Sequence, residues 1–403
     1  MSTAHLLSRD GLPEAVATQR HVETHARGQS SRARRILVLS VSAGAGHVRA
    51  AQAIEAHAAR RTDVDILHLD ALDYMASGFR RVYSDYYLQL VARYPALWGQ
   101  LYKATDRAEP DAWPQRLRRG IERTSARALL RALDVTDPDL ILCTHFLPAE
   151  LLGYLAARRP LRSPVWVQVT DFDLHRMWVQ PNVAGYFVAS EEVAHRMRAR
   201  GVPAERIHLT GIPVMPAFRQ LPERRACALE LSLDPQRPTV LLMGGGAGLG
   251  GLPAVAAQLL GCDARVQLAV LAGRNPAVLA AMKALAAAHP GRVAALPFTD
   301  RVERVMACAD LVVTKPGGLT VSECLAFGLP MVLHSPIPGQ EERNADYLLE
   351  QGVAVKAGDA VTLEYLVRQL LSDAERRAAM AARARALGRP DAAGKVIEIL
   401  LAG

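Results

Sequence analysis

The sequence has few of the patterns that would settle a function at once. Its five cysteines are scattered along 403 residues without the spacing of a metal site, so we expect reduced, buried thiols in a cytoplasmic protein. The P-loop pattern GxxxxGK[ST] does not occur, which argues against a P-loop ATPase. Zinc-finger, RNP and K-homology signatures are also missing, which makes nucleic acid the weakest candidate partner.

Long apolar runs and excess acidic charge are missing too. No stretch reaches the length of a membrane-spanning helix, and residues 1–35 lack the apolar core of a secretory signal. We expect residues 1–35 to be a disordered basic tail. The net charge of +8 and the isoelectric point of about 9.4 favour an anionic partner, such as a membrane surface or an anionic co-substrate.

Two halves of the chain open in the same way, with a short apolar run, a Gly-rich loop and a helical pattern. The apolar runs are residues 36–41 and 239–243. This alternation predicts parallel sheets with helices on both faces, in two doubly wound, Rossmann-like domains. Because prolines cluster before residue 239, the predicted divisions are 36–215 for the first domain, 216–238 for a linker and 239–403 for the second domain.

The segment around Gly317 and Gly318 is the most informative one. It follows an apolar run, makes a tight turn and opens a helix, so free backbone N–H groups at the helix N-terminus would favour an anion. Glu323 lies one turn into that helix, within reach of a ribose diol. The segment predicts a nucleotide-diphosphate site, although an ordinary strand-to-helix turn is the alternative.

The first Gly-rich loop offers a catalytic base. Gly44 and Gly46 allow a ligand to approach the backbone, and His47 begins the following helix at the interdomain crevice. A neutral imidazole could take a proton from a hydroxyl nucleophile, and the helix N-terminus is expected to lower its pKa. The alternative is a capping histidine without a catalytic role.

The second domain has a comparable loop and two further polar segments. No acidic residue follows the loop at the position that a nicotinamide site needs, so a phosphate- or sugar-facing loop is the better interpretation. Arg274 follows a strand and is a candidate anion partner, or else a surface residue at a helix start. Gln340 and Glu341 could hydrogen-bond sugar hydroxyls, although acids at a helix N-terminus also match its dipole. The loop glycines are Gly244, Gly245, Gly246 and Gly248.

Asp171 follows a strand at the same predicted sheet edge as His47. It could orient a base or bind an acceptor hydroxyl. A metal site from Asp171, Asp173 and His175 is conceivable, but loop acids near one histidine are usually not a cation site, and none is predicted.

Residues 75–119 hold eight of the aromatic residues, interleaved with arginines and lysine. Aromatic rings with basic neighbours suit the headgroup layer of an anionic membrane, although many of these rings can also pack inward. The candidate acceptor and membrane residues here are Arg80, Arg81, Tyr94, Trp98 and Tyr102.

Taken together, these segments resemble the family of monogalactosyldiacylglycerol synthases and processive diacylglycerol glucosyltransferases. The matching segments are residues 42–48, 94–103, 170–178, 210–214, 243–246, 273–275, 314–318 and 338–341. The resemblance implies a GT-B fold and an inverting transferase that uses a UDP-sugar without a metal or organic cofactor. It places the base at or near His47, the ribose contact at Glu323 and the donor sugar at Gln340 and Glu341.

The resemblance also assigns other donor contacts. It puts the pyrophosphate near Gly245 and Gly246, and the uracil at the backbone of Phe298 and Thr299. The remaining donor-binding predictions are Gly273, Asn275, Gly317, Gly318 and Thr320. One position departs from the family pattern, because Met215 stands where an arginine is common; Arg274 or Arg219 could replace its phosphate contact.

The sequence therefore predicts a peripheral enzyme at the cytoplasmic face of the membrane, which moves glucose or galactose from UDP-glucose or UDP-galactose to diacylglycerol. Two alternatives remain at this point. One is another GT-B enzyme, such as a UDP-sugar 2-epimerase, and the other is a non-catalytic UDP-sugar sensor, which would not need His47.

Overall fold

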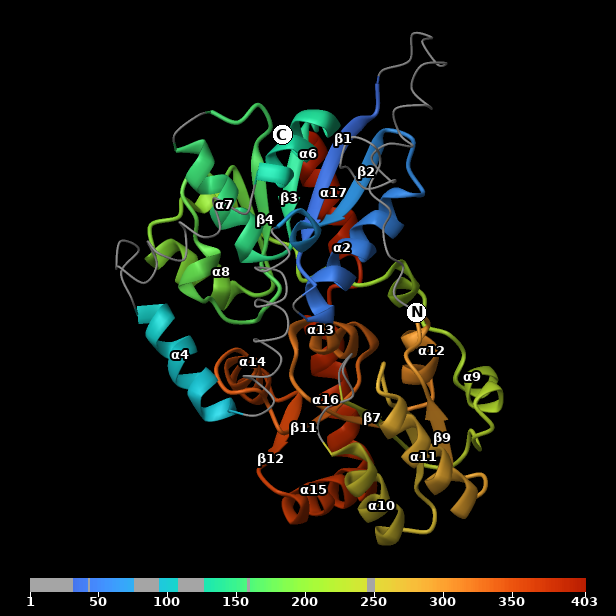
Figure 1. Cartoon of the computed structure of the whole chain (residues 1–403). Helices are drawn as coiled ribbons and strands as arrows, with labels where there is room; N and C mark the ends of the chain where they lie inside the picture. Colours follow the sequence, from blue (N-terminus) through green and yellow to red (C-terminus); the bar gives the residue numbers. More distant parts are fainter. Residues whose placement is uncertain (1–31, 43, 76–93, 108–126, 158–159, 245–250) are drawn as a thin grey trace.

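The structure is a computed structural model (Figure 1). It describes residues 32–42, 44–75, 94–107, 127–157, 160–244 and 251–403. Two parallel six-stranded sheets form the centres of two domains, one above the other in Figure 1. The predicted doubly wound, two-domain architecture is confirmed.

The first sheet has the strand order β2-β1-β3-β4-β5-β6, and all its neighbouring strands are parallel. Its strands are β1 (Arg34–Ser40), β2 (Val64–Asp70), β3 (Leu140–Cys143), β4 (Val165–Gln168), β5 (Gly185–Val188) and β6 (Ile207–Leu209). The helices of this half are α2 (Ala45–Ala58), η2 (Ala71–Tyr74), α4 (Pro95–Arg107), α6 (Arg127–Thr136), α7 (Phe146–Ala156), η3 (Arg176–Trp178), α8 (Glu191–Ala199) and η4 (Ala204–Arg206), where η marks a 3₁₀ helix.

The second sheet has the order β12-β11-β10-β7-β8-β9 and is also parallel throughout. Its strands are β7 (Thr239–Met243), β8 (Gln267–Leu271), β9 (Val293–Leu296), β10 (Leu311–Thr314), β11 (Met331–His334) and β12 (Ala354–Ala357). Its helices are α10 (Leu252–Cys262), α11 (Pro276–Ala288), α12 (Val302–Ala307), α13 (Gly318–Phe327), α14 (Gln340–Glu350), α15 (Ala360–Ser372), α16 (Ala374–Leu387) and α17 (Ala392–Ala402).

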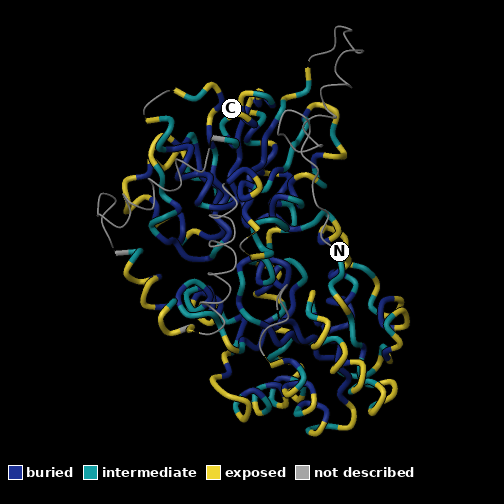
Figure 2. The backbone as a smooth tube through the Cα atoms, in the orientation of Figure 1, coloured by how far each residue is buried: buried dark blue, intermediate teal, exposed yellow. Residues whose placement is uncertain are grey.

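The central strands are buried on both faces, as Figure 2 shows for the middle of each domain. Residues of β3, β7, β8 and β10 are buried without interruption, because helices cover both sides of a parallel sheet. This is why these strands were visible in the sequence as continuous apolar runs. The edge strands β6 and β12 are short and partly exposed, and the sequence did not reveal them.

The final helix returns to the first domain. Val396, Ile397 and Leu400 of α17 pack in one apolar cluster with Ile36 and Val38 of β1. Figure 1 shows this C-terminal helix beside α2 and β1. The predicted second domain ends at residue 403, but the structure packs residues 392–402 against the first sheet.

The predicted linker at 216–238 contains ordered elements. They are η5 (Pro216–Arg219) and α9 (Arg224–Glu230). Phe218 and Cys227 are buried in a cluster with residues of the second domain, so apolar side chains fix much of this linker in place.

All five cysteines are free, and four of them are buried. Among the described residues, no helix has the length and apolarity needed to cross a membrane.

Candidate active site

The carboxyl ends of the two sheets face each other. Thr170 follows β4 of the first sheet, and Gly318 begins α13 after β10 of the second. A Cβ atom on Gly318 would overlap the carbonyl oxygen of Thr170, so only glycine permits this approach of the domains. Gly46 of α2 also lies at this junction, where a Cβ would be in ordinary contact with Leu319 at 3.8 Å.

His47 lies in the first turn of α2, at this junction. Its Nδ1 is 3.0 Å from the carbonyl oxygen of Thr144 and 2.9 Å from the hydroxyl oxygen of Thr170. Because a carbonyl oxygen only accepts, Nδ1 carries the proton in this arrangement and donates it. Nε2 then keeps its lone pair and can accept a proton from a substrate.

Burial, opposed by the hydrogen bond to Thr144, lowers the pKa of His47 to about 4. The sequence predicted a lowered pKa, but for a different reason, the positive end of the helix dipole. Loss of water around the ring is the main cause, because it disfavours the charged imidazolium. The imidazole is therefore neutral at any pH near neutrality.

A small cavity of about 70 Å³ opens beside His47. Its lining includes four other residues predicted from the sequence, which come from both domains: Trp98 and Tyr102 of α4, Asp171, and Gln340 of α14. His145 and Trp178 line it as well and were not predicted. The ring of His145 meets that of His47 edge to face, with ring centres 4.5 Å apart. Trp178 lies in the segment 170–178 that carries the family resemblance, but no role was assigned to it there, and no sequence pattern marked His145.

Asp171 belongs to this cavity and is held by Asn344 of α14, whose Nδ2 is 3.4 Å from Oδ1. Burial raises the pKa of Asp171 to about 6, although hydrogen bonds from Asn344 and Trp178 oppose the rise. Asn344 is fully buried and also donates to the carbonyl oxygen of Pro316. This residue, missed in the sequence, therefore connects the loop of Asp171 to the turn before α13.

Asp173 and His175 do not converge with Asp171 on a cation. Asp173 forms an ion pair with Arg343 of α14 at 2.5 Å. His175 Nε2 lies 3.2 Å from the carbonyl oxygen of Tyr102, and its Nδ1 accepts the Met177 N–H. Asp173 is therefore tied to α14, and His175 is tied to α4.

Glu323 lies on α13 where the sequence placed it, and it is buried. Burial raises its pKa to about 7, and the nearby charge of Arg49 opposes the rise. Arg49 of α2 donates to Asp300 across the domain junction, at 3.0 Å. Arg49 was not among the residues predicted from the sequence, although it lies two residues after His47.

Several donor-binding predictions lie at the ends of β8 and β9. Arg274 is exposed and its guanidinium stacks over the ring of Phe298, 4.3 Å from the ring centre. The Phe298 N–H donates to the carbonyl of Gly273, which ties the two loops together. Asn275 caps α11 by accepting two backbone N–H groups, and the Thr299 hydroxyl accepts the Arg301 N–H.

Glu341 follows Gln340 at the start of α14, beside the Gly317 turn. It is buried and its carboxylate accepts the Ile337 N–H at 2.6 Å. Burial raises its pKa, while that hydrogen bond and the charge of Lys315 oppose the rise. A Cβ on Gly317 would lie 3.6 Å from Glu341, so the two loops are in direct contact. Thr320 is partly buried in the first turn of α13.

Some predicted residues cannot be placed. Gly244 is buried at the end of β7, but Gly245, Gly246 and Gly248 lie outside the described residues. Arg80 and Arg81 also lie outside them. Gly44 is exposed with a φ of 117°, a conformation that side-chain-bearing residues rarely adopt.

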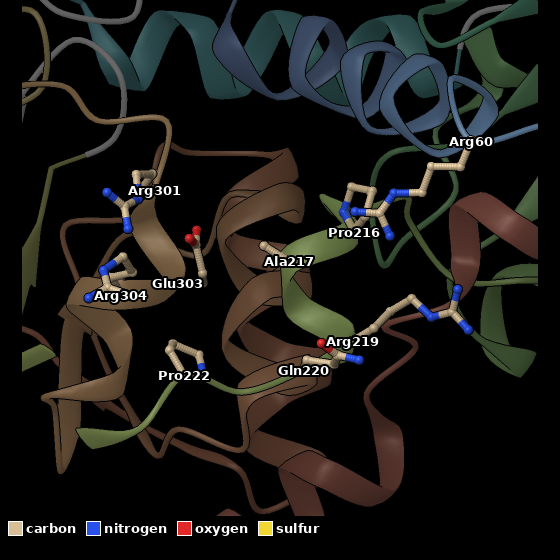
Figure 3. Close-up of a pocket in the computed structure, with 9 residues that line it drawn as sticks. All are labelled: Arg60, Pro216, Ala217, Arg219, Gln220, Pro222, Arg301, Glu303 and Arg304. Carbon is tan, nitrogen blue, oxygen red and sulfur yellow. The ribbon is translucent and has the colours of Figure 1, made fainter. Parts of the chain in front are cut away.

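A larger cavity of about 480 Å³ lies between the end of α2, η5 and α12 (Figure 3). Its arginines mostly have acidic partners: Arg219 pairs with Asp391, and Arg304 with Glu230. Arg219 extends away from α12 in Figure 3. Met215, at the position where an arginine is common, is partly buried against the second-domain cluster. Arg219 is therefore engaged elsewhere, and Arg274 remains the candidate for the phosphate contact.

Comparison with protein families matches both domains. Residues 47–214 match the model for monogalactosyldiacylglycerol (MGDG) synthase, and residues 239–396 match the glycosyltransferase family 28 C-terminal domain. The chain belongs to the glycosyltransferase family that combines these two domains.

A curated relative of this enzyme is "Processive diacylglycerol beta-glucosyltransferase" of Bacillus subtilis (strain 168). The two are 26% identical over 341 residues, which are 84% of this chain and 87% of the relative. Solved structures with similar folds are Acinetobacter baumannii MurG, with a TM-score of 0.60 and 17% identity, and the S. aureus MnaA-UDP complex, with 0.59 and 12%. The first likeness covers 92% of this chain and 100% of the other, and the second covers 90% and 95%. At these identities they show the fold, GT-B, as predicted.

Proposed function

We propose that this glycosyltransferase moves a hexose from UDP-glucose or UDP-galactose to the free hydroxyl of diacylglycerol, at the cytoplasmic face of an anionic membrane. The observation that carries the proposal is the cavity where His47, Asp171 and Gln340 meet. It brings a neutral base from the first domain next to the predicted donor-sugar position of the second. The curated relative supports the acceptor class.

The chemistry is a single displacement at the anomeric carbon. Nε2 of His47 accepts the proton of the attacking hydroxyl while that oxygen bonds to the sugar carbon. The bond from this carbon to UDP breaks, and its electron pair leaves with the diphosphate. Because the hydroxyl attacks from the opposite face, the configuration at the anomeric carbon is inverted. Asp171, next to His47, is suited to hydrogen-bond the acceptor hydroxyl and orient it.

The leaving diphosphate would be met by protein groups. The first turn of α13, from Gly318, presents N–H groups that have no partner within the helix, and the cations Lys315 and Arg274 follow β10 and β8. Glu323 would accept hydrogen bonds from the ribose diol. We therefore propose that the reaction uses neither a metal ion nor an organic cofactor.

The lipid would approach along α4. Tyr94, just before α4, and Leu97 and Leu101 on it form an apolar stripe and are 62%, 54% and 45% exposed. Trp98 and Tyr102 of the same helix line the cavity. An apolar stripe of this kind can enter the interface of a bilayer. One helix would then contact both the lipid and the reaction site, which gives the acceptor a short path. The five free thiols suit the reducing cytoplasm.

The direct test is an assay with labelled UDP-glucose or UDP-galactose and vesicles that contain diacylglycerol and an anionic phospholipid. The expected product is a glycolipid identified by mass spectrometry, made from one of the two donors. Formation of an epimerised UDP-sugar without any glycolipid would instead support the epimerase alternative. Binding of UDP-sugar with neither reaction would support the sensor alternative.

A further inference from the structure

An ionic cluster joins α4 to α14 beside the cavity. Arg343 of α14 donates to Asp173 at 2.5 Å and to Asp106 of α4 at 3.0 Å. Its guanidinium also lies over the ring of Tyr102, 5.4 Å from the ring centre. The two carboxylates are only 7% and 12% exposed, so this is a largely desolvated cluster.

The cluster lies where α4 contacts the donor-sugar segment. A Cβ on Gly99 of α4 would come within 2.8 Å of Pro338, and one on Gly339 would come equally close to the ring of Tyr102. The next residue, Gln340, lines the cavity together with Tyr102. The wall of the cavity is therefore a contact between α4 and the N-terminus of α14, and Arg343 fixes this contact one turn further along α14.

We propose that Arg343 is a positioning residue, which clamps α4 onto α14 and thereby keeps the sugar-transfer cavity of His47 and Gln340 closed to water. The inference rests on the proposed sugar transfer. A glycosyltransferase must protect its donor from hydrolysis, and both α4 and the start of α14 line this cavity, beside the predicted donor-sugar position. Loosening α4 would admit water as a competing nucleophile. Water would then bond to the sugar carbon, the bond to UDP would break, and the proton would pass to His47.

Replacing Arg343 would not leave the carboxylates of Asp173 and Asp106 without a neighbouring cation. Arg196 of α8 and Arg200, which follows this helix, approach the same carboxylates, Asp173 at 3.5 Å and Asp106 at 3.2 Å. After Arg343→Gln both acids therefore keep a cationic neighbour on the first-domain side, and only the link to α14 is lost. This predicts a folded variant with a changed reaction outcome.

The test measures glycolipid formation and free-sugar release in one assay with the same labelled UDP-sugar. For Arg343→Gln we expect transfer to fall about tenfold and the ratio of hydrolysis to transfer to rise at least about tenfold, because misplaced groups slow transfer while water gains access. The Kd for UDP, which depends on Glu323, should stay unchanged. Arg343→Lys should lie between, since a lysine cannot bridge both carboxylates in the same plane.

Two further variants separate positioning from general damage. Arg224→Gln removes an arginine of similar exposure that pairs with Asp310, far along the chain from α4, and should leave the ratio unchanged. Asp106→Asn should raise the ratio as Arg343→Gln does, and the double variant should raise it no further, as expected for one unit. Asp106→Asn also serves as the test if Arg343→Gln does not fold.

A ratio that stays at the wild-type value in Arg343→Gln, or in Asp106→Asn, would overturn the inference, even if total activity falls. Failure of the proposed acceptor is distinguishable. If wild type forms no glycolipid from diacylglycerol, hydrolysis of the UDP-sugar alone should still rise in Arg343→Gln but not in Arg224→Gln.

Discussion

The carbonyl oxygen of Thr170 lies against Cα of Gly318, with no room for a methyl group between them. This contact joins the end of β4 in one domain to the start of α13 in the other. It sets how closely His47, beside Thr170, approaches the predicted diphosphate position at the N-terminus of α13. The distance between base and donor therefore depends on a residue that performs no chemistry.

Gly318→Ala should accordingly reduce kcat by about 100-fold, since a shift of about 1 Å in reacting groups can cost that much. The second domain should still fold, because the clash is with the other domain. Gly261→Ala is the matched control: its new methyl group meets nothing within 4 Å, so activity should be unchanged and stability slightly higher. Normal turnover of Gly318→Ala would show that the domains do not approach this closely during the reaction.

His47→Ala should lower kcat by about 100-fold or more and leave the affinity for UDP unchanged, as expected for loss of a general base. Calorimetry with UDP and kcat on the same preparation measure both. His208→Ala is the control, since this histidine lies on β6 and packs against Trp166 of β4 and Phe187 of β5. A His47→Ala protein with a lowered Tm but normal turnover would identify a structural histidine.

Burial raises the pKa of Glu323 to about 7, so UDP binding should depend on pH if Glu323 contacts the ribose. Below pH 7 the carboxyl group is mostly protonated and is a poorer acceptor for the ribose diol. We therefore expect the affinity for UDP to increase from pH 6 to pH 8 in wild type. Glu323→Ala should weaken binding by about 1.5–3 kcal/mol at pH 8, the range for hydrogen bonds to a charged group. Equal affinity of the two proteins at pH 8 would remove Glu323 from the ribose site.

The same carboxyl group affects stability, and the sign follows from its raised pKa. The folded protein binds the proton more tightly than the unfolded chain, so this stabilisation is complete below the ordinary value of 4.5 and disappears as pH rises through about 7. Glu323→Gln mimics the protonated form. Its Tm should match that of wild type at pH 4.5 and exceed it at pH 8. A variant that is less stable than wild type at pH 8 would contradict this prediction.

Removal of divalent cations should leave turnover largely intact. The physical reason is that helix α13 and the cations Lys315 and Arg274 are available to stabilise the departing diphosphate. Activity measured before and after EDTA, and again after adding magnesium or manganese, decides the point. An enzyme that EDTA inactivates and either metal restores would show that the diphosphate needs a metal.

Changing the exposed stripe of α4 to serine, at Tyr94, Leu97 and Leu101 together, should weaken vesicle binding by at least about tenfold, since each large apolar side chain contributes roughly 1.5–3 kcal/mol when buried. Sedimentation with anionic vesicles measures it, and UDP affinity should not change. Serine at Val361 and Tyr365 is the control, because these side chains are equally exposed but lie on α15. Equal sedimentation of both variants would place the lipid contact elsewhere.

The architecture could be predicted from the sequence, because strands buried on both faces must be apolar throughout. Residues 36–41 and 311–313 were therefore visible as strands, and the Gly-rich segments after them marked the carboxyl edges where His47 and Glu323 lie. The edge strand Ala354–Ala357 was missed, since a half-exposed strand carries a weaker pattern. The packing of α17 on β1 could not be predicted from the sequence either, since it depends on how the two domains are arranged in space.

The environment of each site residue, in contrast, depends on contacts that form only in the folded chain. The sequence placed His47 at a helix start, but the folded chain removes it from water and ties Nδ1 to Thr144, from another strand end. Likewise the roles of Asn344 and Arg343 depend on their hydrogen bonds to aspartates that lie far away in the sequence. Asn344 bonds to Asp171, and Arg343 bonds to Asp173 and Asp106. A local pattern records which elements form and where they end. Burial and charge pairing arise between segments that the fold brings together. A single sequence contains no pattern that indicates these long-range contacts.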